Sequence, residues 1–157
     1  MAAHGATVYV KGVVSGQFLV YSPDRIVVEG DITYARDPRS VPDSDDFLGL
    51  VCDRNIEVAP TLVTGRGDLH IQAAMFAKRR FAVRNASHPR SATLYIFGSL
   101  AAGTMSESEP RYATKLEHDW RFERLRPPGF PSMNRFVTED WDRQWTDVPE
   151  RPVSTDF

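Results

Sequence analysis

The sequence contains one cysteine and no long hydrophobic run, and both shortages limit what the protein can be. Cys52 has no partner for an intrachain disulfide, so a disulfide-stapled scaffold is excluded. No stretch approaches the roughly 20 apolar residues that a membrane-spanning helix needs. The N-terminus lacks the basic start and apolar centre of a signal peptide, so we expect any targeting segment to lie outside this chain, as in a fragment of a longer product.

The chain also has little excess charge of either sign. Its 19 basic and 21 acidic residues leave a formal net charge of -2. This balance excludes a global field that would draw the protein onto nucleic acid or anionic lipid. A basic triplet, Lys78 to Arg80, is interpreted as a solvated turn.

Motifs of several common enzyme classes are missing as well. There is no Gly-x-Ser-x-Gly, no phosphate-binding loop and no dinucleotide fingerprint. The histidines are scattered without ligand spacing, so we expect no metal site and no cofactor. Asp43, Asp45 and Asp46 could in principle hold calcium, but they lack the spacing and the glycine of a calcium loop, which favours a solvated loop. The apolar neighbours of Cys52 indicate a buried filler and not a nucleophile.

What the first hundred residues do contain is a series of short apolar runs separated by turn-forming residues. The runs are rich in Val, Ile, Phe and Tyr, which predicts β-strands. The predicted strands cover Thr7–Val14, Phe18–Tyr21, Ile26–Tyr34, Phe47–Cys52, Ile56–Val58, Leu69–Phe76, Phe81–Val83 and Leu94–Leu100. Only Leu69–Arg80 could also be a helix on propensity.

A loose repeat runs through these strands. The segments VYVKGVV (Val8–Val14), IVVEGDI (Ile26–Ile32) and LYIFGSL (Leu94–Leu100) share one pattern of apolar residues around a glycine. Equivalent strand starts fall at Val8, Ile26, Ile56 and Phe81, with spacings of 18, 30 and 25 residues.

This repeat predicts an all-β, single-domain parallel β-solenoid, or β-helix, in which short strands follow one another around a common core. Gly12, Gly30 and Gly98 would mark the bends, because glycine turns without a side chain. Residues 1–104 would form the turns of the solenoid. A β-sandwich is the alternative, although the hairpin dipeptides Asn-Gly and Asp-Gly are absent.

Residues 105–157 have a different character. They are rich in proline and aromatic residues, and we expect an irregular extension that wraps along the solenoid or caps its open end. Some of its residues could instead dock a partner or stack on sugar rings. These candidate partner-binding residues are Trp120, Arg121, Phe130, Trp141 and Trp145. Packing within the chain is the favoured alternative for them.

The sequence resembles a family of poorly characterised bacterial envelope proteins related to PilX-type pilus-assembly proteins. The resemblance covers Val8 to Pro131 and depends on the order of five segments. These are IVVEGDITYA, DFLGLVCDRNIEV, DLHIQAAMFAKRRFAV, ATLYIFGSLAAG and HDWRFERLRPPGFP. Cys52 and His118 depart from the family pattern, where a small residue and an aromatic residue are expected. The resemblance implies a surface or pilus-associated location and a structural role without established enzyme chemistry.

We therefore expect a non-catalytic structural or assembly module of the bacterial cell envelope that associates with itself or with protein partners. No nucleic acid partner is expected, and a cytoplasmic location stays open. The alternative is a carbohydrate-active β-helical enzyme or a carbohydrate-binding module. In that case Asp31, Asp53 and Asp68, each beside a predicted bend, would be the catalytic acids and bases. Turn capping is the favoured reading of these aspartates.

Overall fold

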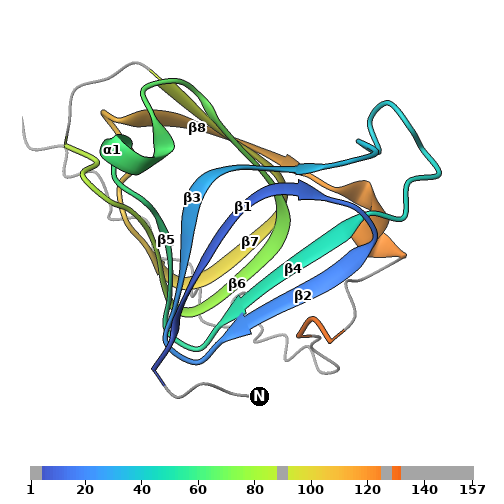
Figure 1. Cartoon of the computed structure of the whole chain (residues 1–157), viewed down its shortest axis with the longest axis horizontal. Helices are drawn as coiled ribbons and strands as arrows, with labels where there is room; N and C mark the ends of the chain where they lie inside the picture. Colours follow the sequence, from blue (N-terminus) through green and yellow to red (C-terminus); the bar gives the residue numbers. More distant parts are fainter. Residues whose placement is uncertain (1–4, 88–91, 125–128, 132–157) are drawn as a thin grey trace, which may run out of the picture.

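The computed structural model describes residues 5–87, 92–124 and 129–131 (Figure 1). The strands are β1 (Thr7–Val14), β2 (Gln17–Ser22), β3 (Arg25–Tyr34), β4 (Phe47–Cys52), β5 (Asn55–Val58), β6 (Leu69–Val83), β7 (Ala92–Met105) and β8 (Tyr112–His118). The helices are the four-residue α1 (Thr61–Thr64) and the 3-10 turn η1 (Trp120–Glu123). The prediction of a mostly β protein is confirmed.

All of these strands join one sheet, and every strand pairing among the described residues is parallel. The order along the main path is β1-β3-β5-β6-β4-β2, while β7 pairs with β6 and β8 pairs with β7. The sheet curves until it nearly closes on itself (Figure 1). The β-sandwich alternative is wrong, because a sandwich of that class is built from antiparallel strands.

The predicted strand starts form one column of paired residues. Val8 pairs with Ile26, Ile26 with Ile56, and Ile56 with Phe81. The spacing of these starts in the sequence therefore corresponds to their register in the sheet. The third glycine segment does not belong to this column, since its first residue, Leu94, pairs with Leu69 on another part of the sheet.

β3 bends within its length (Figure 1), and its Gly30-Asp31 pair lies at a shift in the register between β1 and β3. Val10 pairs with Val28, but Gly12 pairs with Ile32, so three residues of β3 lie opposite Lys11 alone. Such a shift bends the longer strand. Gly12 has a φ of 115°, a conformation that disfavours any residue with a side chain.

The core lies inside the curved sheet and consists of apolar side chains stacked from strand to strand. Ile32, Ile71 and Ile96 form one such column and are at most 2% exposed. Stacking of this kind buries whole side chains, each worth about 1.5–3 kcal/mol. It follows from the parallel register, which places residues of the same type above one another.

The predicted strands Leu69–Phe76 and Phe81–Val83 are confirmed and belong to one long strand, β6, so the helix that propensity allowed over Leu69–Arg80 does not form. Two elements differ from the sequence-based expectations. The helix α1 lies in a segment for which no element was predicted. Strand β8 was missed because its residues after Tyr112 are all exposed, so they carry no apolar signal.

Candidate functional site

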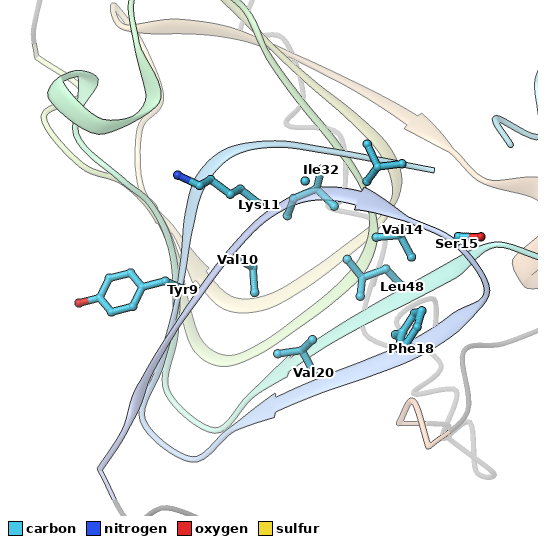
Figure 2. A pocket seen from close by; sticks show the side chains of 11 residues that line it. Tyr9, Val10, Lys11, Val14, Ser15, Phe18, Val20, Ile32 and Leu48 are labelled. Carbon is cyan, nitrogen blue, oxygen red and sulfur yellow. The ribbon is translucent and has the colours of Figure 1, made fainter. Parts of the chain in front are cut away.

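The end of the sheet formed by β1 and β2, here called the N-terminal end, contains an open apolar cavity of about 490 Å³. Figure 2 shows Val10, Val14, Val20 and Leu48 around this space. Ile32 also lines it, and this residue is otherwise buried in the core. The cavity therefore exposes the end of the hydrophobic core.

The register of β1 explains why the cavity exists. Gly12 is the residue of β1 that pairs with Ile32, so the column of stacked isoleucines ends in a residue without a side chain. A Cβ atom placed on Gly12 would meet no atom within 4 Å. The first strand thus leaves a gap where the deeper strands of the column carry a large apolar group.

Exposed apolar side chains surround this end. Val13 is 72% exposed, Tyr9 62% and Phe18 52%. Within the described part of the chain, β1 pairs with β3 alone and β2 with β4 alone, so each has one edge without a neighbouring strand. Apolar surface next to an open strand edge is typical of a surface that binds protein.

The three candidate catalytic aspartates are all exposed, and two of them hold the backbone of a neighbouring strand. Asp31 accepts a hydrogen bond of 2.8 Å from the N–H of His70, and Asp68 accepts one of 2.7 Å from the N–H of Thr93. Asp53, in the turn between β4 and β5, accepts a 2.6 Å hydrogen bond from the Tyr21 hydroxyl. The contacts of Asp31 and Asp68 are those of capping residues.

Two of the described partner-binding candidates, Trp120 and Arg121, make contacts within the chain. Trp120 packs edge-on against Phe97, with ring centroids 5.9 Å apart, and remains 45% exposed. Arg121 is 6% exposed and bound within the chain, while Phe130 is half-buried. Trp141 and Trp145 lie outside the described residues.

The loop before β4 uses its acidic residues for internal contacts. Asp46 is fully buried and accepts hydrogen bonds from the N–H groups of Gly16 (2.6 Å) and Arg36 (2.8 Å). Asp45 pairs with the Arg36 guanidinium, and Asp43 is exposed. Among residues 5–87, 92–124 and 129–131, no group of three or more His, Cys, Asp or Glu side chains is placed to hold a metal ion.

Cys52 and the basic triplet have ordinary surroundings. Cys52 is fully buried, and this burial raises the pKa of its thiol, which disfavours the reactive thiolate. Lys78 to Arg80 are exposed at the bend of β6, where the N–H groups of Arg79 and Arg80 donate to the carbonyl of Arg54.

A second hollow, of about 250 Å³, crosses the outer face of β6, β7 and β8 and was missed in the sequence analysis. His70 and Tyr95 stack with ring centroids 4.7 Å apart, and the Lys115 ammonium lies 5.4 Å from the Tyr95 ring centroid. The Arg39 guanidinium lies over Phe97 in the same region. His70, Tyr95 and Lys115 pair across parallel strands and are far apart in the sequence, so only knowledge of the register could have grouped them.

Asp37 anchors the loop that brings Arg39 to this hollow. It accepts hydrogen bonds from the Arg39 side chain and from the Gln72 amide. The hydrogen bonds from Arg39 are the main reason that the pKa of Asp37 falls from 3.8 to about 2.

This pKa predicts a loss of stability in acid. Because the pKa is lower in the folded state, the contribution is fully present above pH 4 and disappears as the pH falls toward 2. Since Arg39 is partly exposed, we expect about 1 kcal/mol. Urea unfolding at pH 5 and pH 2 measures it. Asp37→Asn should reduce the difference in the free energy of unfolding between pH 5 and pH 2. Asp43→Asn, on the same loop, should leave this difference as in the wild type. If both variants showed the same difference, the assignment to Asp37 would be contradicted.

No helix among the described residues has the length and apolar character needed to cross a membrane. Comparisons of the chain with protein-family models, curated proteins and solved structures found no match.

Proposed function

We propose that this chain is a non-catalytic structural module of the bacterial cell envelope, associated with pilus assembly, which associates with copies of itself through its ends. The observation that carries this proposal is the N-terminal end, where an apolar cavity of about 490 Å³ opens beside two strand edges that have no partner strand among the described residues. Terminal repeats that stand alone in solution usually present a polar cap. An uncapped apolar end is better suited to an assembly.

The finer fold assignment is part of this proposal. The sheet is a parallel β-solenoid in which successive turns begin at Val8, Ile26, Ile56 and Phe81. β8 lies within residues 105–157, which were expected to be irregular, and adds one more parallel strand to this sheet. Two observations support this assignment: the column that links these four residues, and the parallel direction of all the pairings among described residues. In such a fold each turn of the chain covers the previous one, so the first and last turns have free edges.

A carbohydrate-binding module is the second candidate, and the hollow over β6, β7 and β8 favours it. Aromatic and charged side chains line this hollow, a combination used for sugars. However, His70 stacks on the Tyr95 ring and Lys115 also lies over it, which leaves little of that ring for a sugar. This candidate therefore ranks below assembly.

Measuring the mass of the protein in solution over a range of concentrations tests the first candidate. We expect the average mass to rise with concentration, and we expect Val13→Glu to suppress the rise because it places a charge on the apolar end. Leu62→Glu is the matched control, since Leu62 is 99% exposed on α1 and its replacement should leave association unchanged. A constant monomer mass, together with polysaccharide binding that Tyr95→Ala abolishes, would favour the second candidate.

A further inference from the structure

The two ends of the sheet carry complementary features along the same column of side chains. Gly12 pairs with Ile32, Ile32 with Ile71, Ile71 with Ile96, and Ile96 with Leu116 of β8. The column thus begins with a gap at Gly12 and ends with a large side chain at Leu116. Leu116 is 59% exposed, because no described strand lies beyond β8.

A second column has the same relation to the two ends. It begins at Val8, passes through Ile26, Ile56 and Phe81, and ends at Met105, which is 58% exposed. Each column therefore leaves one apolar side chain exposed at the end formed by β8 and the last residue of β7, here called the C-terminal end.

The strand edges at the two ends also fit each other. In the described part of the chain, β1 and β8 are each paired along one edge only. Because all of the described pairings are parallel, Gly12–Val14 of a second copy can follow Leu116–His118 of β8 while Val8 follows Met105 of β7, in the direction that the sheet already has. The unpaired N–H and C=O groups of both edges would then be satisfied.

We propose that the C-terminal end of one copy binds the N-terminal end of the next, with Leu116 filling the gap above Gly12 and Met105 meeting Val8. This inference rests on the proposed self-association and specifies its geometry. The contact is head-to-tail, so it does not close on itself, and further copies can add at either end. A head-to-head dimer would instead place two cavities together and leave Leu116 in solvent.

Cross-linking between two single-cysteine additions tests this geometry. One preparation carries Val8→Cys and the other Met105→Cys. Neighbouring parallel strands lie about 4.8 Å apart, which is within the Cα separation that a disulfide allows. On mild oxidation we expect a covalent dimer in the mixture and little in either preparation alone. The wild type is the control for Cys52, which is buried and should not cross-link.

The outcomes separate this inference from the proposed function. Self-association accompanied by Val8→Cys homodimers, or by no cross-link, would overturn the head-to-tail geometry but leave self-association standing. A protein that stays monomeric at all concentrations would overturn both.

Changing Leu116 provides a second measurement. Leu116→Ala removes the side chain that fills the gap, and we expect association to weaken roughly tenfold, since apolar anchors at interfaces contribute more than about 1 kcal/mol. Because Leu116 is largely exposed, the variant should fold normally, which its urea midpoint checks. Unchanged association of Leu116→Ala would contradict the proposal, and Leu62→Ala is the control.

Discussion

Replacing Gly98 with alanine is expected to destabilise the folded protein strongly. Gly98 lies in β7 opposite Ala73 of the central strand β6, and it has a φ of 148°. A Cβ atom there would lie 2.0 Å from the Ala73 carbonyl oxygen and 2.7 Å from its carbonyl carbon. Both atoms belong to the backbone, so no side chain can rotate away. The clash adds to the cost of the unfavourable φ, so we expect the free energy of unfolding to fall by more than about 3 kcal/mol.

Gly67→Ala is the matched control for this prediction. Gly67 lies in a surface turn, where an added Cβ would meet no atom within 4 Å and φ is ordinary for an L-residue. Its replacement should change stability by less than about 0.5 kcal/mol. Urea unfolding followed by circular dichroism measures both variants. If Gly98→Ala and Gly67→Ala unfolded at the same urea concentration, the close approach of β7 to β6 would be refuted.

Arg121→Ala is expected to cause the second large loss of stability. Asp119 is fully buried, and its carboxylate accepts hydrogen bonds from Nε (2.9 Å) and Nη2 (2.6 Å) of Arg121. The guanidinium also donates to the carbonyl oxygens of Ser44 and Asp46 and lies over the Phe47 ring. Removing Arg121 would leave a buried carboxylate without its partner, which typically destabilises a protein by about 3–5 kcal/mol.

A double-mutant cycle isolates the part due to the ion pair. In Asp119→Ala/Arg121→Ala the unpaired charge is gone, so the double variant should be less destabilised than the sum of the two single variants. Arg124→Ala is the control, because Arg124 is exposed at the end of η1. Strictly additive losses in the cycle would mean that Arg121 acts through packing on Phe47 and not through its charge.

The contacts of Arg121 also show why the sequence could not decide between the two interpretations of the C-terminal aromatic segment. Its composition was consistent with docking a partner and with packing inside the chain. Arg121 reaches the carbonyls of a loop more than 70 positions earlier, as the separations of 77 and 75 residues to Ser44 and Asp46 show. Contacts over such distances in the sequence produce no local pattern.

The strands were predictable for the opposite reason. β1, β3 and β4 alternate or concentrate apolar residues within a few positions, and turn-forming residues bound them. That signal is local, because the side chains of a strand alternate between its two faces. β8 lies at the end of the sheet with its side chains mostly in solvent, so the same rule could not detect it.

The sequence by itself determined the strands up to β7 and the starts that form the Val8 column, because local alternation and repeat spacing depend on chain order alone. The tertiary structure decided where the core is exposed, since that depends on which residue covers which. The sequence predicts a bend at Gly12. Only the pairing of Gly12 with Ile32 shows that its missing side chain leaves a gap in the core. Likewise, only the position of Leu116 at the end of the same column makes an ordinary leucine a candidate contact residue.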